Sequence, residues 1–331
     1  MIGLKSLKLL ASLIFISIFC VGCGGKSTKT WEGGIKSVEK TSKVVFRYND
    51  SLFDDRGTGR YTYPIPLEEK EGIFDLKSFV VRDLGNILEF VVEFRRPIDP
   101  EDINGKSYQN GWAYQLVDIY IDTDHKSVSG NTFSLPGRNI EFNDDEAWDK
   151  VIVISPDSEK LVKNYIQSNS DMRYLFDARN DIIPAHNVFS KTYTLVARVR
   201  KSEVGDPQPD WGYQICVMGF DQDNEKRNGL FNMEVKSFAN ETRFGGGTDY
   251  DGSPNVIDIL SPDKKSQYSV MSQFRSNPYT KENLAAIIPM VYGKSKQNMP
   301  KFRQNSMVQP NIRQNAPIDR RYMEPLEGRR R

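Results

Sequence analysis

The chain has 331 residues, 45 basic and 44 acidic side chains, a formal net charge of +1 and three cysteines. Charge is unevenly distributed: residues 294–331 carry ten basic and three acidic side chains, whereas residues 23–293 carry 33 basic and 41 acidic ones. An acidic segment of this size argues against nucleic acid as its partner and favours divalent cations or neutral ligands. About 270 residues suffice for one large β-sandwich or two small domains.

Residues 1–22 have the pattern of a lipoprotein signal peptide. Two lysines precede the apolar run Leu9–Val21, which is too short for a stable transmembrane anchor. The run leads to Gly22 and Cys23, a small residue before a cysteine, as lipoprotein signal peptidase accepts. Leu usually stands three residues before that cysteine, where this chain has Cys20. We therefore expect a lipid on Cys23, with an ordinary secretory signal or a membrane anchor as the alternative.

The processed chain would keep Cys23, blocked by lipid, and Cys216. One free thiol cannot form an intramolecular disulfide, so the exported chain has to be held together by its core or by metals. Residues 23–42 are polar and rich in Gly, Lys, Ser and Thr, which predicts a flexible tether. We expect export and lipid anchoring to the cell envelope, at an outer membrane or the cell surface. Gly24 stands where an aspartate would retain a lipoprotein in an inner membrane.

The elements expected from residue 43 onward are mostly short strands separated by turn residues. The strand-like segments are 44–48, 74–81, 87–94, 114–122, 151–154, 193–199 and 213–220. Asp83–Asn86 lies between the second and third of these segments and has the composition of a hairpin turn. Two stretches are candidate helices, Glu159–Gln167 and Lys281–Ile288.

Alternation is clearest in Tyr114–Asp122. It predicts three residues that face the core, Val117, Ile119 and Ile121, and three that face outward, Asp118, Tyr120 and Asp122. Many short strands favour an all-β sandwich over an α/β fold, and we expect a single domain over residues 43–293. Residues 294–331 lack apolar periodicity and are expected to be a disordered basic tail, a candidate for binding anionic envelope polymers.

Seven motifs follow one another in an order that resembles a known family. They are DDRGTGRYTYP, GIFDLKSFVV, YQLVDIYID, LPGRN, WD, WGYQICVMGFD and GGGTDYDGSPNVIDILSP. Over Lys43–Tyr292 the chain is similar to the C-terminal domain of bacterial glucodextranase, which also occurs in amylopullulanases and other envelope-associated glycan enzymes. That domain is related to family-9 carbohydrate-binding modules and DOMON-like sandwiches. The resemblance implies an antiparallel, immunoglobulin-like or DOMON-like β-sandwich that binds carbohydrate or associates with a surface, and that calcium stabilises.

The stretch DDRGTGRYTYP is the first candidate calcium site. Calcium takes six to eight oxygen ligands, and Asp54 and Asp55 offer carboxylates. Gly57 and Gly59 permit backbone turns that aim carbonyls inward. Asp75 could add a carboxylate if the intervening segment folds back. Related family-9 modules use an early acidic loop of this kind, and the alternative is an ordinary Asp/Gly turn.

Two further acidic clusters occur in the sequence. Asp249 and Asp251 in TDYDGSPN begin like a calcium loop but lack the Glu that completes an EF-hand, so only a non-helical oxygen site is compatible. Asp122 and Asp124 in IDTDHK lie at the end of a strand, where capping of the turn is the favoured role.

Sugar recognition needs flat rings and paired donors and acceptors. The candidate ligand patch combines Trp112 and Tyr114 with Arg138 and Asn139 of the LPGRN loop, and Trp211 is a further candidate. Arg138 supplies a fork of donors, and Asn139 supplies both a donor and an acceptor. The alternatives are a structural role for each tryptophan and, for Arg138, a buried arginine that organises its loop through a carboxylate.

Catalytic motifs are lacking from the sequence: only His125 and His186 are present, with no nucleophile elbow, zinc-protease motif or phosphate loop. We therefore expect no enzyme activity. The favoured hypothesis is an envelope lipoprotein that binds, or docks to, α-glucan or envelope polysaccharide. One alternative is a structural or adaptor protein that binds another envelope protein through the sandwich or the basic tail. A glycoside hydrolase with two opposed carboxylates is the other.

Overall fold

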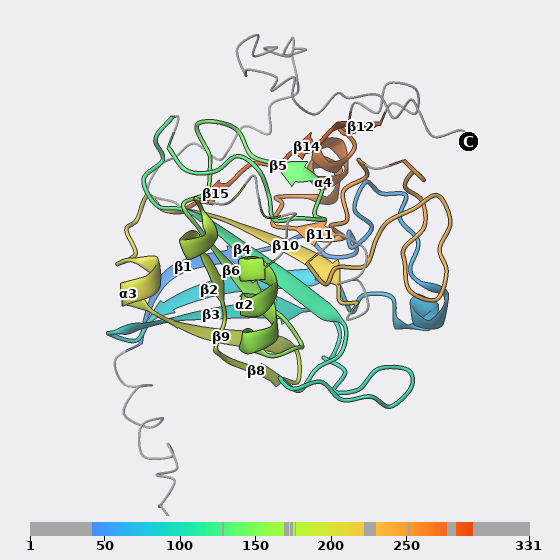
Figure 1. Ribbon diagram of the computed structural model, residues 1–331, viewed down its shortest axis with the longest axis horizontal. Helices are drawn as coiled ribbons and strands as arrows, with labels where there is room; N and C mark the ends of the chain where they lie inside the picture. The colour runs from blue at the N-terminus through green and yellow to red at the C-terminus, as the bar shows by residue number, and fades with distance from the viewer. Residues whose placement is uncertain are drawn as a thin grey trace, which may run out of the picture. The chain divides into compact units, whose positions relative to one another are not determined.

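The computed structural model describes residues 42–293 except 128, 169–171, 173, 174, 176, 222–229, 251 and 277–282. The chain divides into two units, and the first, Met1–Lys40, lies outside the described residues. The predicted signal peptide, the predicted lipidation site Cys23 and residues 294–331 also lie outside the described residues. The second unit contains all of the described residues, which Figure 1 shows in colour. Within these residues, no helix is both long and apolar enough to cross a membrane.

The first sheet has five strands, and every pair of neighbours is antiparallel. In spatial order they are β1 (Lys43–Asn49), β2 (Leu76–Asp83), β3 (Ile87–Phe94), β9 (Thr194–Arg200) and β8 (Asn187–Lys191). The predicted hairpin turn between β2 and β3 is confirmed, because the N–H of Leu84 donates to the carbonyl of Ile87 at 2.9 Å.

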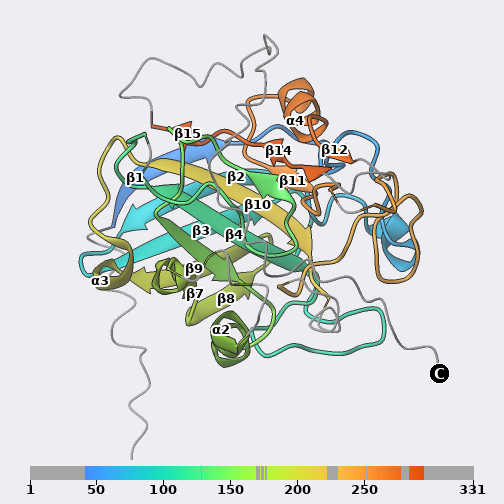
Figure 2. The same cartoon turned by 45° about the horizontal axis from the view of Figure 1, so that its top comes forward.

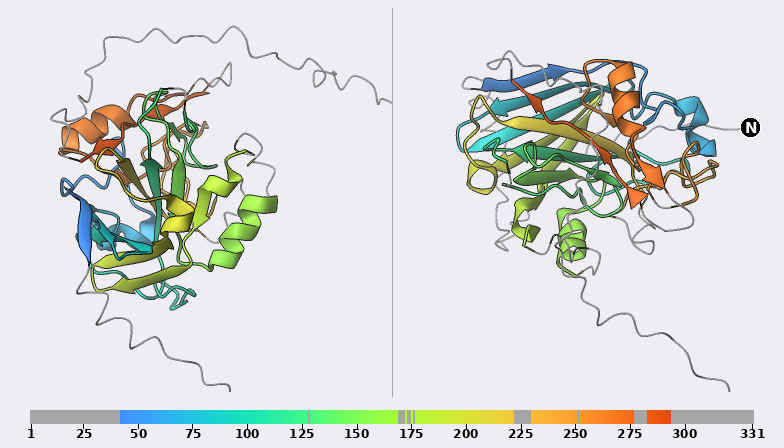
Figure 3. Two further views of the ribbon diagram at one scale, coloured as in Figure 1. Left: turned by 90° about the vertical axis from the view of Figure 1, so that its left-hand side faces the viewer. Right: turned by 90° about the horizontal axis from the view of Figure 1, so that it is seen from above.

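The second sheet lies against the first and is built mainly from antiparallel pairs. Its order is β11 (Asp258–Ile259), β10 (Gly212–Gly219), β4 (Gln115–Asp122), β6 (Lys150–Ile154) and β7 (Ile182–Pro184), with β15 (Val291–Tyr292) also paired to β10. The β6–β7 pair is parallel. The two sheets form the all-β sandwich that the strand pattern predicts, and Figure 3 shows them as adjacent layers.

Short elements close the ends of the sandwich. The small strand pairs are β12 (Arg275–Ser276) with β13 (Asn283–Leu284), and β5 (Ile140–Glu141) with β14 (Ala286–Ile287). The helical elements are η1 (Ile65–Lys70), α2 (Glu159–Ser168), η3 (Arg179–Asp181), α3 (Lys201–Val204) and α4 (Lys264–Met271). Figure 2 shows α2 near β7 and α4 near β11, which are at opposite edges of the second sheet.

The helix prediction was right at one of its two positions. Residues 159–167 lie in α2, whose apolar side is buried. The helix predicted over 281–288 is wrong, because β13 and β14 occupy its described part. The α4 helix was not predicted, since its sequence KKSQYSVM is mostly polar; it begins where the carboxylate of Asp263 accepts the N–H of Ser266, as a helix N-cap does.

Both faces of the second sheet are buried. Val117, Ile119 and Ile121 pack against the first sheet, as predicted. The opposite face of β4 does not meet solvent as predicted, because α2, α4 and the loops cover it with a second apolar cluster. Asp118, Tyr120 and Asp122 are therefore at most 1% exposed. The period-2 pattern identifies two faces but cannot tell a solvated face from one covered by later segments.

Candidate functional site

Five aspartates meet at the connection between β1 and β2. Asp50 directly follows β1, Asp54 and Asp55 lie in the connection, Asp75 immediately precedes β2, and Asp258 lies in β11 of the other sheet. Four of the side chains are 0–1% exposed and Asp50 is half-buried. Three carboxylate oxygens lie within 4.8 Å of one another, one each from Asp50, Asp54 and Asp258. The fold thus gathers acidic side chains from segments about 200 residues apart in the sequence.

Many oxygens of this cluster lack a hydrogen-bond donor. The buried atoms without a partner include Oδ2 of Asp50, both carboxylate oxygens of Asp54, Oδ1 of Asp55 and Oδ1 of Asp75. They are the only buried carboxylate oxygens without a partner among the residues that the structure describes. Buried polar groups in native proteins are almost always paired, so five unpaired oxygens in one place form a set that a further bound group could complete.

The remaining oxygens are held by the protein. Oδ1 of Asp50 accepts the N–H of Ser261 at 2.7 Å, and Oδ2 of Asp258 accepts the N–H of Leu76 at 2.7 Å. Oδ2 of Asp55 accepts the hydroxyl of Tyr63. These bonds fix the orientation of the carboxylates, which therefore converge without any bound group.

The electrostatics of the cluster are unfavourable for the bare carboxylates. Burial, followed by the charge of Asp75, raises the pKa of Asp54 to about 7; the nearby hydroxyl of Ser51 and the backbone N–H of Asp54 act in the opposite direction but make no hydrogen bond of normal geometry with this carboxylate. Burial, followed by the charge of Asp55, raises the pKa of Asp75 to about 6. Burial is also the main cause that raises the pKa of Asp50, Asp55 and Asp258. Such a site has to take up protons or a cation.

The residues fit a calcium ion. Calcium binds six to eight hard oxygens at about 2.3–2.6 Å, so two ligands on opposite sides of one ion lie up to about 5 Å apart. The carboxylate oxygens of Asp50, Asp54 and Asp258 lie within 4.8 Å of one another, which agrees with that separation. Asp54 supplies two unpaired oxygens, and its backbone carbonyl is already turned to accept the amide of Gln267 at 2.6 Å. The donor set is all oxygen, which suits calcium and does not suit zinc or copper.

Two glycines shape the connection, as the sequence predicted. Gly57 has φ 52° and Gly59 has φ 86°, the left-handed region that other residues rarely adopt. The N–H of Gly57 donates to the carbonyl of Ile257 at 2.8 Å, which ties the loop to the strand segment that carries Asp258. A Cβ at Gly57 would lie 2.2 Å from the ring of Tyr61, and one at Gly59 would lie 2.7 Å from the ring of Tyr268.

Asp75 links the cluster to the protein surface. Its Oδ1 is one of the unpaired oxygens, whereas its Oδ2 accepts the N–H of Phe53 at 2.8 Å and the Nε–H of Arg95 at 2.5 Å. The guanidinium carbon of Arg95 lies 4.3 Å from the centre of the Phe53 ring. Phe53 itself is 59% exposed.

The other predicted metal ligands do not join this cluster. Asp249 is exposed, and its Oδ1 accepts the N–H of Ser237 at 3.2 Å; this hydrogen bond is the largest of the causes that lower the pKa of Asp249. No group of three metal-binding side chains found among the described residues includes it. Asp251 lies outside the described residues.

Asp122 and Asp124 cap the turn after β4, as expected. Oδ1 of Asp122 accepts the N–H of His125 at 2.7 Å, and Oδ1 of Asp124 accepts the N–H of Lys126 at 3.1 Å. Asp149 lies near both carboxylates, but its Oδ2 accepts the N–H of Thr123. Protein donors therefore satisfy this second cluster, in contrast to the first.

The predicted sugar patch is wrong in its aromatic residues. Trp112 is 0% exposed, and its Nε1–H donates to the carbonyl of Gln115 at 2.7 Å. Tyr114 and Trp211 are each 4% exposed and belong to the core between the sheets. A sugar ring cannot stack on these side chains, so the structural alternative holds for the two tryptophans, and Tyr114 is also a core residue. The sequence marks where aromatic residues occur, but burial depends on how the loops fold over them.

Arg138 has the structural role that was the alternative to ligand binding. Its Nε and Nη2 donate to the two oxygens of Asp118 at 2.7 and 3.0 Å, and both side chains are fully buried. Its Nη1 donates to the carbonyl of Leu230 at 2.9 Å. Asn139 is half-buried, and its amide donates to the carbonyl of Ser253 at 2.9 Å. The side chains of Arg138 and Asn139 in the LPGRN loop thus bind the protein's own sheet and loops, and they do not form a ligand patch.

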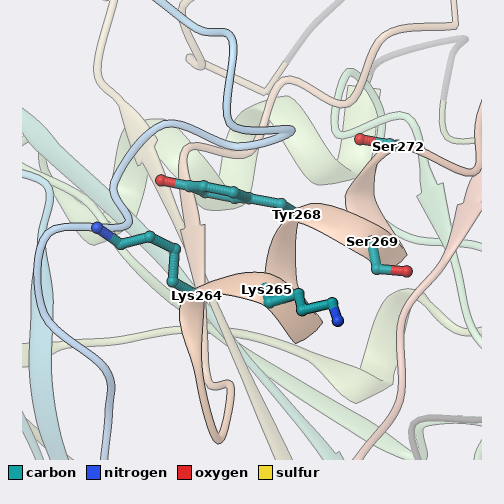
Figure 4. A pocket seen from close by; sticks show the side chains of 5 residues that line it. All are labelled: Lys264, Lys265, Tyr268, Ser269 and Ser272. Carbon is teal, nitrogen blue, oxygen red and sulfur yellow. The ribbon is translucent and has the colours of Figure 1, made fainter.

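A surface pocket lies on α4, beside the acidic connection. Its lining residues are Lys264, Lys265, Tyr268, Ser269 and Ser272, and Figure 4 shows Tyr268 and Lys264 pointing to the same side. Burial, together with the charges of Asp54 and Asp55, raises the pKa of Tyr268 to about 12. The helix therefore covers one side of the acidic cluster and presents two lysines outward.

Sequence reasoning missed two members of the cluster, Asp50 and Asp258. Asp258 interrupts the apolar run Val256–Leu260, and an acidic residue inside such a run is a signal of a buried, functional carboxylate. Asp50 has no comparable signal, because an aspartate after a strand is common in turns.

The fold and the site define an all-β sandwich protein with a cluster of buried carboxylates in the connection between β1 and β2. It belongs to the family described as the SLH-like C-terminal binding module of glucodextranase, which matches residues 45–289. The resemblance seen in the seven motifs is thereby confirmed. A search of curated proteins found no match. Membership in a family of binding modules indicates a carbohydrate-binding role and association with the cell surface, and is compatible with the absence of enzyme activity.

Proposed function

We propose that this protein is a non-catalytic, calcium-stabilised carbohydrate-binding module of the cell envelope. The family match carries the carbohydrate role, because the matched segment spans almost the whole described sandwich. Neutral α-glucans or an envelope polysaccharide are the ligands that we propose. An acidic protein surface favours neutral sugars over anionic polymers as the ligand of the sandwich.

The acidic cluster supports the calcium part of the proposal. Five buried carboxylate oxygens without a donor, on four of the five aspartates, form a donor set that a divalent cation would complete. Bound calcium would join β11 of one sheet to the connection that follows β1 of the other. With Cys216 buried and free, calcium would take the part that disulfides have in many exported proteins.

The first residues support the membrane part of the proposal. The apolar run before Cys23 and the polar residues after it would hold the sandwich at a membrane through lipid on that cysteine. The tether of residues 23–42 would leave the sandwich free to reach a polysaccharide.

Affinity electrophoresis and retention on immobilised polysaccharides test the proposal. The mature chain is applied to α-glucans and to envelope polysaccharide, with calcium and with a chelator. We expect retention on at least one of them in calcium. Lack of retention on every polysaccharide at every calcium level would overturn the carbohydrate role, and a defined protein partner bound instead would favour the structural or adaptor function.

A further inference from the structure

Phe53 combines two unusual features at the edge of the acidic cluster. Its ring is 59% exposed, although burial of a phenylalanine is strongly favourable. Its backbone has φ 66°, a region that bulky residues other than glycine rarely adopt. The fold therefore holds an apolar ring in solvent, in a strained conformation, without the burial that would offset the strain. Such outliers are typical of functional sites.

Asp75 and Arg95 hold Phe53 in place. Oδ2 of Asp75 accepts the N–H of Phe53, which fixes the left-handed backbone, and the same oxygen accepts the Nε–H of Arg95. The guanidinium of Arg95 lies 4.3 Å from the ring centre, so it occupies one side of the ring. Leu52, the preceding residue in the sequence, is also exposed, at 37%.

We propose that Phe53 is the stacking platform for a neutral pyranose ring of the bound polysaccharide, a site that rests on the carbohydrate-binding function proposed above. The apolar C–H face of a pyranose packs on an aromatic ring. Among the described residues, no hydrogen bond from the terminal nitrogens of Arg95 is found, and its side chain is 23% exposed. Nη2 packs against Gly72, so Nη1 is the atom that we expect to donate to a sugar hydroxyl. The charge of Arg95 is already paired with Asp75, so the platform has no net charge to attract an anionic polymer.

The geometry also links this platform to the ion site. Oδ2 of Asp75 accepts the N–H of Phe53, Oδ1 of the same carboxylate has no partner, and the charge of Asp75 acts on Asp54 of the acidic cluster. An ion bound by Oδ1 would fix the orientation of the carboxylate and, through it, the backbone of Phe53. Removal of the ion should therefore weaken sugar binding in a protein that remains folded.

The test uses affinity electrophoresis of the mature chain through gels that contain a neutral α-glucan or an anionic polygalacturonate, in calcium. Phe53→Ala should bind the glucan about tenfold or more weakly, since a stacked ring is lost. Phe53→Tyr should bind like the wild type. Phe53→Gly also removes the ring but relieves the positive φ, so it should lose binding at a melting temperature no lower than that of Phe53→Ala.

The matched control is Phe238→Ala, which removes a phenylalanine that is 78% exposed on a different loop. It should bind like the wild type. Chelation should weaken the wild type and leave the weak binding of Phe53→Ala unchanged. The α4 lysines supply a competing surface, tested with the double variant Lys264→Ala/Lys265→Ala, which should also bind like the wild type.

Several results would overturn the assignment. They are wild-type affinity in Phe53→Ala, loss of binding in Phe238→Ala or in the double lysine variant, and retardation by the anionic polymer alone. Equal wild-type binding with and without chelator would overturn the link to the ion. If the wild type binds and the Phe53 variants bind equally, only this inference fails. If the wild type binds no polysaccharide, the proposed function fails and this inference with it.

Discussion

Arg138 and Asp118 form a bidentate ion pair in which both side chains are 0% exposed, with N–O distances of 2.7 and 3.0 Å. Asp118 lies in the middle of β4, on the face of the second sheet that the loops cover. Arg138 lies in the loop that precedes β5 and also contacts the carbonyls of Pro136 and Leu230. One buried guanidinium thus joins the sheet to two loops.

Arg138→Met should destabilise the protein by about 3–5 kcal/mol, because it leaves the buried carboxylate of Asp118 without its partner. Urea denaturation measures the free energy of unfolding. The control is Lys77→Met, which removes an exposed ion pair with Glu93 on the first sheet and should change the stability by less than about 1 kcal/mol. If Arg138→Met fails to fold, Asp118→Leu/Arg138→Met should recover folding. Equal effects of the two single variants would contradict the structural role.

Chelation should lower the melting temperature by several degrees. Calcium at 100 times its dissociation constant contributes about 2.7 kcal/mol to a protein that binds it only when folded. Differential scanning calorimetry in calcium and in chelator measures the difference, with magnesium as the control ion. An identical melting curve in all conditions would rule out a structural ion.

Asp54→Asn should change stability in opposite directions with and without calcium. In calcium, the variant loses a ligand with two unpaired oxygens and should melt at a lower temperature. In chelator, it removes a buried charge that repels Asp75 and should melt at a higher temperature than the wild type. Asp249→Asn is the control, since this exposed aspartate lies outside the cluster. A calcium effect lost in the control and kept in Asp54→Asn would move the ion to the loop that contains Asp249.

The metal-free protein should lose stability as the pH rises. The pKa of Asp54 is raised from 3.8 to about 7 in the folded state. Between these two values the folded state binds more protons than the unfolded state, so stability is greatest at the acidic end of the window and falls through pH 7. The melting temperature in chelator should therefore decrease from pH 5 to pH 8. Because calcium replaces protons on the same oxygens, the increment due to calcium should grow over this range. A metal-free protein that gains stability with rising pH would contradict these ionisation states.

Cys23→Ser should release the protein from the membrane fraction. The cysteine is the proposed site of lipid attachment, and stable anchoring needs more than one acyl chain. Fractionation of cells and labelling with radioactive palmitate measure the effect, with Cys20→Ser as the control. Label retained in the Cys23 variant would show that the anchor lies elsewhere.

The strand pattern alone determined the class of fold. The segments predicted as strands at 44–48, 87–94 and 151–154 lie within β1, β3 and β6, because alternating apolar residues report which backbone can pack on a core. The motif order determined the family. Of the group whose oxygens lie within 4.8 Å, the sequence identified only Asp54; Asp55 and Asp75 lie next to that group, because the glycines mark a turn that brings acidic residues together.

Only the tertiary structure decided which residues meet and which remain accessible. Asp258 reaches Asp54 because β11 pairs with β10 at the edge of the other sheet, a long-range relationship that no local pattern contains. Trp112 is buried and Phe53 is exposed, although a tryptophan in a loop is the more obvious platform in the sequence. Local periodicity is a property of neighbouring residues, whereas convergence of charges and exposure of rings depend on how distant segments pack against one another.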